Sequence, residues 1–364
     1  MDPKRIYLSP PLLEGNERKY LLEALDSNWV APTGPFVERL EETLKQYTGM
    51  PGVVAMNSGT SAIHIALRLC GVGPGDEVIC PTFSFIASAG PVTYLGAKPL
   101  FVDCEPVTWN MDPVLLEKTL QECKSRSNRV KAVIFAYCYG MPSNMVQIKS
   151  ICDHFEVPLI EDAAEALGST YNYKPAGTFG TFGIYSFNGN KIATGSVGGA
   201  LLCNDPSLAI HARKLASQAK EQTQHFEHHE VGYNYAMSNL AAAVILGQFE
   251  QLEAKVNKRR SVFENYTYQF KTTSGVNWQM EVDGALSNRW LSAFTFNLQC
   301  KFNKDILMEK LAQSNIESRP LWKPLHTQKA FSYPFCKIFP VSELLFRTGL
   351  CLPSGTAINI LTYV

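Results

Sequence analysis

The segment VPLIEDAAEALGSTYNYKPAGTFGTFGIYSFNGNK (157–191) carries the strongest indication of the fold and of a candidate site. Its first apolar run ends at two acids, Glu161 and Asp162, and its second, FGIYSF (182–187), ends shortly before Lys191. Short apolar runs of this kind are typical of buried strands in a parallel sheet. Because ligands bind beyond the carboxyl ends of such strands, we expect an acid and a lysine there to meet the same ligand.

Similar apolar runs recur on both sides of this segment. From about residue 50 to 204 they alternate with helical patterns, which indicates stacked βαβ units and a mainly parallel sheet. The predicted strands are GVVAM (52–56), DEVIC (76–80), KPLFV (98–102), RVKAVIF (129–135), VPLI (157–160), FGIYSF (182–187) and GGALLC (198–203). We therefore expect an α/β fold built on these seven strands.

Helical periodicity explains much of the remaining sequence. The predicted helices cover residues 60–70, 112–123, 205–220, 238–270 and 303–314. Short strands such as SAFTFNL (292–298) follow the long helical stretches, so we expect a smaller α+β domain at the C-terminal end. The predicted domains are 1–250, which includes the N-terminal segment, and 251–364.

The composition argues against several classes of protein. The 364 residues are 46% apolar and 18% charged, which is typical of a folded globular chain and not of a disordered one. The formal net charge is zero and no long basic run occurs, so we expect neither a nucleic-acid nor a membrane partner. The N-terminus lacks the apolar core of a secretory signal, so we expect a cytoplasmic protein.

The cysteines and histidines indicate neither a disulfide framework nor a metal site. The ten cysteines are scattered without a C-x-x-C pair, which fits free thiols in a reducing compartment. The cluster HFEHHE (225–230) lacks the H-E-x-x-H spacing of a zinc site. We therefore interpret this cluster as a solvated polar segment and expect no metal.

The sequence NSGTS (57–61) joins a predicted strand to a predicted helix. Unpaired N–H groups and the positive end of the helix dipole suit a phosphate there, and the hydroxyls of Thr60 and Ser61 add donors. Taken alone, this turn is better explained by a serine or threonine that caps the helix without a ligand. The chain has no G-x-x-x-x-G-K-[ST] motif, so a nucleotide P-loop is not indicated.

Adjacent side chains point in different directions, so only one of the two acids is expected to face the ligand. Asp162 is followed by two alanines that permit close approach, and we expect Glu161 to face solvent or to cap the helix. A lysine such as Lys191, held among small residues, becomes a nucleophile toward carbonyl groups. Together with the phosphate cradle, the acid and the lysine match the needs of pyridoxal phosphate.

These residues resemble those of the sugar aminotransferases of the DegT/DnrJ/EryC family, within the aspartate aminotransferase fold type I. The resemblance covers nearly the whole chain. It is carried by WVAPTGPFVERLEE (29–42), NSGTSA (57–62), GDEVICPTFSFIASA (75–89), GAKPLFVD (96–103), EDAAEALGS (161–169), GTFGTFGIYSFNGNK (177–191), GYNYAMSN (232–239) and RPLWKPLHTQ (319–328). It implies a large pyridoxal-phosphate-binding α/β domain with a smaller C-terminal α+β domain.

The resemblance also assigns roles to individual residues. It makes Lys191 the Schiff-base lysine and Asp162 the partner of the pyridine nitrogen. The other implied cofactor contacts are Gly59, Thr60, Ser61 and Ser186 at the phosphate, Phe85 against the ring, and Glu165, where many relatives carry histidine, near the phenolic oxygen. Without the family likeness, Phe85 is more simply read as a core residue.

Two further sets of residues follow from the resemblance. Asn234 is expected to reach the phosphate of a neighbouring subunit, which implies a homodimer with shared active sites. The residues that match the sugar-nucleotide side of relatives are Arg289, Arg319, Trp322 and His326. For each of these four, a structural role is a nearly equal alternative.

The sequence departs from the family pattern in two places. Relatives usually read N-Y-R where this chain reads Asn234-Tyr235-Ala236, so the contact of that arginine is expected to be absent or replaced. Relatives also continue into a further helix beyond the point where this chain ends at Val364. We therefore expect the C-terminal domain to lack one packing element.

The segments LSPP (8–11), SNRWLS (287–292) and CLPSGTA (351–357), among others, look closest to the bacillosamine-pathway enzymes. The implied reaction moves the amino group of L-glutamate to carbon 4 of a UDP-linked 4-keto-6-deoxy-N-acetylglucosamine. The alternatives are GDP-perosamine formation, amination at carbon 3 of a dTDP-sugar, and a non-catalytic relative that binds pyridoxal phosphate. The dehydratase branch of the family carries histidine in place of the lysine, so Lys191 argues against it.

Overall fold

The computed structural model of the chain describes residues 5–125, 130–299, 303–331 and 338–356. The expected lack of one packing element in the C-terminal domain stays a prediction, because the last residues of the sequence, 357–364, lie outside the described residues. Among the helices that the structure describes, none has both the length and the apolar character needed to cross a membrane.

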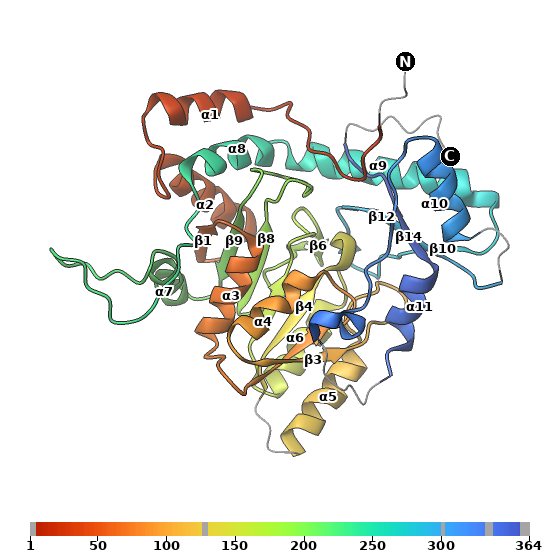
Figure 1. The fold of residues 1–364 in the computed structure, drawn as a ribbon, viewed down its shortest axis with the longest axis horizontal. Coiled ribbons are helices and arrows are strands. Elements are labelled where there is room, and N and C mark those ends of the chain that lie inside the picture. The colour runs from red at the N-terminus through yellow and green to blue at the C-terminus, as the bar shows by residue number, and fades with distance from the viewer. Residues whose placement is uncertain (1–4, 126–129, 300–302, 332–337, 357–364) are drawn as a thin grey trace.

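A seven-stranded sheet forms the centre of the molecule (Figure 1). Its strands are β1 (Gly52–Met56), β2 (Glu77–Pro81), β3 (Lys98–Val102), β4 (Val130–Ala136), β5 (Leu159–Asp162), β8 (Phe182–Ser186) and β9 (Gly199–Cys203). The strand order is β1-β9-β8-β5-β4-β2-β3, and β9 alone in this sheet runs antiparallel to its neighbours. The predicted α/β fold and the predicted strands are confirmed, with bounds that differ by one or two residues.

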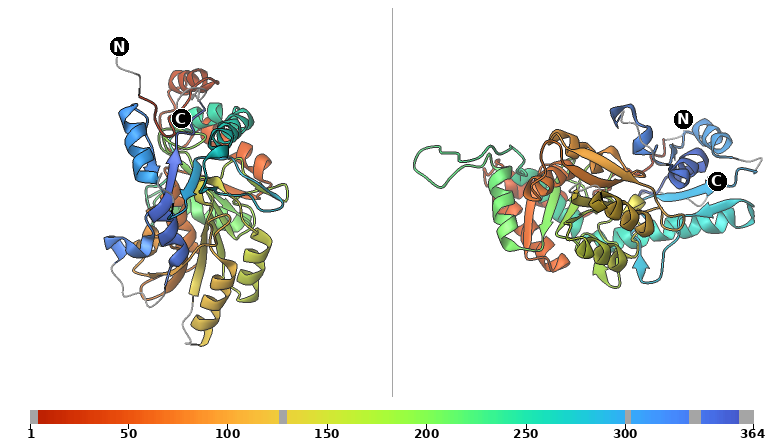
Figure 2. Two further views of the ribbon diagram at one scale, coloured as in Figure 1. Left: turned by 90° about the vertical axis from the view of Figure 1, so that its right-hand side faces the viewer. Right: turned by 90° about the horizontal axis from the view of Figure 1, so that it is seen from below.

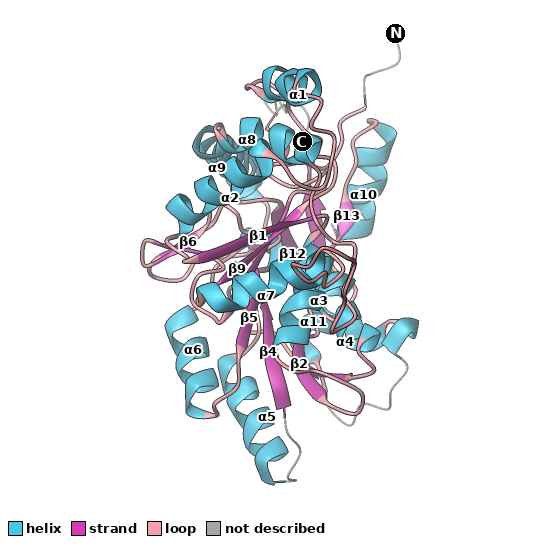
Figure 3. Cartoon of the chain, turned by 90° about the vertical axis from the view of Figure 1, so that its left-hand side faces the viewer, coloured by secondary structure: helices cyan, strands magenta, loops and turns pink. Residues whose placement is uncertain are grey.

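Helices cover both faces of this sheet (Figure 3). They are α1 (Glu17–Asp26), α2 (Pro35–Thr48), α3 (Gly59–Leu69), α4 (Gly90–Tyr94), α5 (Pro113–Ser125), α6 (Met145–His154), α7 (Pro206–Ala216) and α8 (Asn239–Phe249). Alternate residues of a strand face opposite sides, and in β1 this places Val53 in one core cluster and Val54 in the other. The first cluster includes residues of α2, α5, α6 and α8, and the second includes residues of α3, α4 and α7.

A second, antiparallel sheet lies beside the central sheet and its covering helices, and it has its own apolar cluster. Its strands, in sheet order, are β10 (Val276–Trp278), β12 (Ser292–Phe296), β14 (Gly349–Leu352) and β13 (Arg319–Pro320). The accompanying helices are α9 (Leu252–Gln269), α10 (Lys304–Gln313) and α11 (Pro340–Thr348). A small third sheet joins β11 (Ala285–Leu286), β6 (Thr170–Tyr171) and β7 (Lys174–Pro175).

One predicted helix is corrected by the structure. The stretch 238–270 is not continuous but forms α8 and α9, which are separated at Glu250 and Gln251. The Glu250 carboxylate accepts hydrogen bonds from Asn16 Nδ2 and from the Tyr20 hydroxyl, so the break lies where the N-terminal segment attaches. Helix α9 contributes residues to the first core cluster and also to the apolar cluster of the second sheet. The predicted domain boundary at residue 250 therefore stays a prediction.

The segment between α7 and α8 extends away from the body of the molecule (Figure 1). The view from below in Figure 2 shows the same extension. Two isolated bridges, Ser217 to Asn234 and Lys220 to His228, join its two arms. The side chains of His225 and His229 are exposed, in accord with a solvated segment.

Candidate active site

A cavity of about 310 Å³ lies at the carboxyl edge of the central sheet. Because the strands other than β9 run parallel, the segments that follow β1, β2, β4, β5 and β8 meet at this edge. The lining includes Ser58, Gly59, Thr60, Phe85, Ser88, Asp162, Glu165, Ser186, Asn190, Lys191, Trp290 and Trp322.

Lys191 enters this cavity from the turn that follows β8. Its backbone N–H donates to the Asn188 carbonyl at 2.9 Å. Its Nζ lies 3.6 Å from Oε1 of Glu165 and 4.2 Å from the centre of the Trp290 ring. Because the side chain is only 13% exposed, the amine sits in a largely dehydrated site, as expected for a lysine that reacts with carbonyl groups.

Asp162 is the last residue of β5 and faces the same cavity. Its Oδ2 accepts a hydrogen bond from Ser88 Oγ at 2.6 Å, and its Oδ1 accepts one from the Ala164 N–H at 3.2 Å. Burial raises the pKa of Asp162, although these hydrogen bonds and the charge of Lys191 act in the opposite direction. The ionised form of this carboxyl would therefore gain from a further cationic partner.

Glu161 does not face solvent or cap a helix, which corrects the expectation from the sequence. Its side chain is fully buried away from the cavity and accepts hydrogen bonds from the Tyr137 hydroxyl and from backbone N–H groups. The backbone donors are Gly177, Phe179 and Gly180. Neighbouring strand residues point to opposite faces, and in this sheet both faces are covered, so neither acid reaches solvent.

Glu165 is the second carboxylate of the cavity. It accepts a hydrogen bond from the Tyr139 N–H at 2.8 Å and forms the ion pair with Lys191. Burial raises the pKa of Glu165, and the charge of Lys191 opposes this rise. The cavity thus combines two acids with one amine at this end.

The start of α3 forms the other end of the cavity. Ser58 is the N-cap, and its Oγ accepts from the Ser61 N–H at 3.0 Å. Gly59 and Thr60 line the cavity, whereas the Ser61 hydroxyl donates to Asn57 Oδ1 at 2.6 Å. The Ser61 hydroxyl thus has a partner within the turn, and its predicted contact with a phosphate stays a prediction.

The residues present fit pyridoxal phosphate. The positive end of α3 suits its phosphate, and Ser186 lines the cavity nearby, because a Cβ added to Gly59 would lie 3.2 Å from the Ser186 Cβ. The pyridinium nitrogen is a cation of the kind that the buried Asp162 carboxyl would gain from. Lys191 supplies the amine that its aldehyde requires.

A larger cavity of about 1000 Å³ adjoins the first. The residues that line both cavities are Ser84, Phe85, Asn190, Trp290 and Trp322. The rings of Phe85 and Trp322 lie 5.5 Å apart at this junction. Arg319, one of the four residues predicted on the sugar-nucleotide side, lines the larger cavity together with Lys323.

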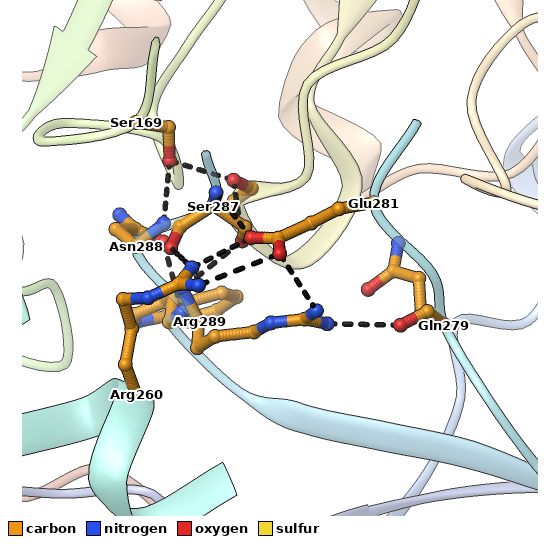
Figure 4. Close-up of polar contacts among 9 residues, drawn as sticks. Ser169, Arg260, Gln279, Glu281, Ser287, Asn288 and Arg289 are labelled. Atoms are coloured by element: carbon orange, nitrogen blue, oxygen red, sulfur yellow. Dashed lines mark hydrogen bonds and ion pairs between the residues drawn. The ribbon is translucent and has the colours of Figure 1, made fainter. Parts of the chain in front are cut away.

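Arg289 and His326 line neither of these two cavities, and their predicted place on the sugar-nucleotide side stays a prediction. Arg289 belongs to a buried cluster in which its Nη2 lies 3.5 Å from Glu281 Oε2 and its Nη1 donates to the Gln279 carbonyl at 2.8 Å (Figure 4). The His326 ring stacks on Phe339, and its Nδ1 lies 2.6 Å from Thr82 Oγ1. Both side chains are thus held by partners within the fold.

Asn234 does not line either cavity of this chain. Its carbonyl accepts from Asn57 Nδ2 at 3.2 Å, at the base of the extended segment. Its predicted contact with a neighbouring subunit stays a prediction.

Sequence reasoning missed several residues of the cavity. Ser88, which donates to Asp162, lies in the quoted segment PTFSFIASA but carries no signal of its own. Asn190 and Trp290 were also assigned no role, although both lie in segments that carry the family resemblance. Trp290 is about a hundred residues from Lys191, so only the tertiary structure brings the two together.

Comparisons with known proteins point to one family. Residues 11–360 match the DegT/DnrJ/EryC1/StrS aminotransferase family. The chain is 48% identical, over 97% of its length and 92% of the relative, to a Bacillus subtilis (strain 168) protein named "Putative pyridoxal phosphate-dependent aminotransferase EpsN". It is 35% identical, over 98% of its length and 95% of the relative, to the GDP-perosamine synthase of Caulobacter vibrioides. The crystal structure of the aminotransferase TlmJ from Streptoalloteichus hindustanus, 29% identical, matches with a TM-score of 0.90 over 98% of this chain and 94% of that chain.

Proposed function

Because the chain belongs to the DegT/DnrJ/EryC1/StrS family and is a pyridoxal-phosphate-dependent sugar aminotransferase, we propose a specific pair of substrates for it. The amino donor is L-glutamate, and the acceptor is UDP-linked 4-keto-6-deoxy-N-acetylglucosamine. The products are 2-oxoglutarate and UDP-4-amino-4,6-dideoxy-N-acetylglucosamine. The enzyme would act in the cytoplasm, in the biosynthesis of bacillosamine or a related glycan.

The observation that carries the proposed chemistry is the position of the Lys191 amine. It lies in a cavity with the buried carboxyl of Asp162 and with the start of α3. The Glu165 carboxylate is 3.6 Å from Nζ, within reach of a proton that the amine holds or releases. The residues to which we assign the phosphate, the ring nitrogen and the aldehyde line one cavity, which supports the proposal.

Bound pyridoxal phosphate supplies an aldehyde that condenses with amines and a ring that accepts the electron pair of a carbon losing its proton. Lys191 anchors this group in the resting enzyme. Once L-glutamate displaces it, the Lys191 amine removes the proton from carbon 2 of the donor. In the second half-reaction the same amine would deliver a proton to carbon 4 of the sugar, and the return of Lys191 to its anchoring position would free the amino sugar.

Asp162 and Phe85 orient the cofactor for this proton transfer. The Asp162 carboxylate holds the ring nitrogen in its protonated form, because an opposite charge at close range favours the cation. Ser88 fixes the direction of that carboxylate through its 2.6 Å hydrogen bond. Phe85 lines the cavity where an offset contact with the ring would exclude water.

The larger cavity is the proposed site of the nucleotide sugar. Its volume of about 1000 Å³ suits a substrate of this size, and Arg319 and Lys323 place positive charge near a diphosphate. The aromatic junction formed by Phe85 and Trp322 suits the methyl group of a 6-deoxy sugar, because a buried hydroxyl there would need a partner.

We further propose that the enzyme is a homodimer with shared active sites. The extended segment between α7 and α8 presents exposed apolar side chains, Phe226 at 78% and Val231 at 82% exposure. A segment that leaves its own subunit and exposes such residues is suited to contact with a second copy. Asn234 at its base would then reach the partner's cofactor phosphate.

A second candidate is GDP-perosamine formation. It is favoured by the 35% identity to a GDP-perosamine synthase over 98% of this chain. This reaction also aminates carbon 4 of a 6-deoxy sugar, so the residues of the first cavity would act in the same way. The two candidates differ in the nucleotide and in the substituent at carbon 2.

The test is incubation of the purified enzyme with L-glutamate and UDP-, GDP- or dTDP-linked ketosugars. Mass spectrometry identifies the aminated product, and NMR assigns the position of the new amine. Amination of the UDP-linked sugar at carbon 4 supports the proposal, and exclusive use of the GDP-linked sugar replaces it with the second candidate. A protein whose visible cofactor absorbance ignores L-glutamate would instead be a non-catalytic relative.

A further inference from the structure

The indole of Trp290 forms one wall around the Lys191 amine. The ring centre lies 4.2 Å from Nζ, on a side chain that is 2% exposed. An indole face attracts an ammonium group, and this attraction strengthens where water is excluded. The Glu165 carboxylate, 3.6 Å from Nζ, is the second group that attracts the same ammonium.

Trp290 is fixed by hydrogen bonds on its side chain and on its backbone. Its Nε1 donates to the Asn190 carbonyl at 2.8 Å, and its backbone N–H donates to Asn288 Oδ1 at 2.9 Å. Its carbonyl accepts from Nη1 of the buried Arg259. The amide of Asn288, in turn, donates to the Glu165 carbonyl at 2.8 Å, so one segment supports both neighbours of the amine.

The Asn190 carbonyl has a second donor from the N-terminal segment. Ser9 Oγ donates to it at 2.7 Å and accepts from Arg259 Nη2 at 3.1 Å. Asn190 directly precedes Lys191, so two hydrogen bonds hold the backbone at the base of the lysine while the indole holds its tip. These contacts come from three distant parts of the chain.

We propose that Trp290 is a positioning residue for Lys191. Its indole face holds the amine toward Glu165 once L-glutamate has displaced it, and its Nε1 acts together with Ser9 to fix the Asn190 carbonyl. The proton-transfer geometry of Lys191 then depends on the segment that carries Trp290 and on the N-terminal segment. This inference rests on the proposed role of Lys191 as proton carrier.

The test compares Trp290→Leu with Trp290→Phe in a single turnover of the holoenzyme with L-glutamate. We expect the rate constant to fall about 10- to 100-fold in the leucine variant, because misplacement of a reacting group by about 1 Å has effects of this size. The phenylalanine variant keeps a ring face and should stay within about threefold of the wild type. Glutamate deuterated at carbon 2 should give a larger isotope effect in the leucine variant, because proton transfer becomes more fully rate-limiting.

Trp278→Leu is the matched control, since Trp278 packs against Phe263, Phe270 and Phe294 in the smaller sheet. It should leave the rate constant and the isotope effect unchanged. Equal rates for the leucine and phenylalanine variants of Trp290, or an unchanged isotope effect in the leucine variant, would overturn the inference. A wild-type enzyme that does not react with L-glutamate would overturn the proposed function instead.

Two measurements keep the inference testable if the leucine variant fails to fold. Ser9→Ala removes one donor to Asn190 and should lower the single-turnover rate constant by about threefold with a raised isotope effect; an unchanged rate would contradict the proposed clamp on Asn190. Acetic anhydride labelling of the full-length, cofactor-free protein reads the amine directly by peptide mass spectrometry. Lys191 should label about threefold faster in Trp290→Met, whose side chain is longer and more flexible than that of leucine but has no ring face, than in Trp290→Phe. The partly exposed Lys149 should label equally in both, and equal labelling of Lys191 would contradict the role of the ring face.

Discussion

Two parts of the molecule hold charges that are shielded from water: the carboxyl edge of the central sheet and the cluster of Arg260, Glu281 and Arg289. The partners that balance these charges differ between the two. In the cluster, the Glu281 carboxylate forms ion pairs with both arginines and accepts a hydrogen bond from the Ser287 N–H (Figure 4). Both arginines also donate hydrogen bonds to backbone carbonyls. At the sheet edge, Asp162 and Glu165 are buried with Lys191 as the single cation of the described lining. A carboxylate paired with two arginines that are themselves fixed marks structure, and two acids that share one reactive amine mark a ligand site.

The largest expected effect is the loss of turnover in Lys191→Ala. We expect kcat to fall at least about a thousandfold, because both the anchor and the proton carrier are removed. The measurement is 2-oxoglutarate formation, with cofactor content determined in parallel, since noncovalent binding should persist. Lys149→Ala, on the surface of α6, is the control; full activity in Lys191→Ala would contradict the assignment.

The next effect separates two neighbouring acids. Asp162→Asn should lower kcat by about 100-fold or more, because a neutral amide does not hold a proton on the ring nitrogen. Glu161→Gln should instead lower the free energy of unfolding by about 2 kcal/mol, because an amide nitrogen cannot accept from the backbone donors that surround it. Steady-state kinetics and denaturant unfolding of both variants check this, and a comparable loss of kcat in Glu161→Gln would break the distinction.

Glu281→Gln should affect stability and not the chemistry. We expect the free energy of unfolding to fall by about 2 kcal/mol at neutral pH, because two arginines lose their shared carboxylate. Although burial opposes ionisation, the hydrogen bonds from Arg260 and Ser287 and the charge of Arg289 lower the pKa of Glu281.

A group whose pKa is lowered in the folded state stabilises the fold above its ordinary value, near 4.5 for glutamate, and loses this contribution as the pH falls further. The difference between Glu281→Gln and the wild type should therefore shrink on acidification below that value. Denaturant unfolding at several pH values measures it, with Asp153→Asn, which removes an exposed ion pair with Lys149, as the matched control. A difference that is independent of pH would show that the charge of Glu281 is not what stabilises the cluster.

The smallest expected effect is an increase in the free energy of unfolding, whereas Glu161→Gln and Glu281→Gln lower it. Burial raises the pKa of Asp162 in the folded, cofactor-free protein. At a pH above this raised pKa, the charge of Asp162 therefore opposes folding. Asp162→Asn should then stabilise the cofactor-free protein slightly at neutral pH, because the amide carries no charge into the buried site. The gain should decrease as the pH falls toward the ordinary aspartate value of 3.8, where the wild-type carboxyl also becomes neutral.

Thermal unfolding of the cofactor-free proteins across this range measures the effect. If Asp162→Asn is less stable than the wild type at neutral pH, partners within the fold already stabilise the ionised Asp162 carboxylate. Asp162 would then not differ from Glu281 in the arginine cluster.

The sequence by itself determined the elements that local patterns encode. Apolar runs specify the seven strands, because each is buried on both faces and needs no alternation. The positions of Asp162, Lys191 and Gly59 after or before those elements place them at one edge, because parallel strands end together. The break between α8 and α9 was not predictable in this way, since the apolar pattern continues through Glu250 and the break coincides with contacts from the distant N-terminal segment.

Only the tertiary structure decided which polar groups already have hydrogen-bond or ion-pair partners within the fold. Glu161 and Asp162 are adjacent acids of similar chemistry, but the first is enclosed by the donors of 177–180 and the second opens on the cavity. Arg289 and His326 carry the charge or donors expected of a substrate site, yet their partners come from Glu281, Thr82 and Phe339. Trp290 lies just before a strand of the second sheet and reaches Lys191 through an apolar cluster that also includes Phe83 and Tyr139 from segments after central strands. Such matches depend on contacts between residues far apart in the chain, which no local pattern records.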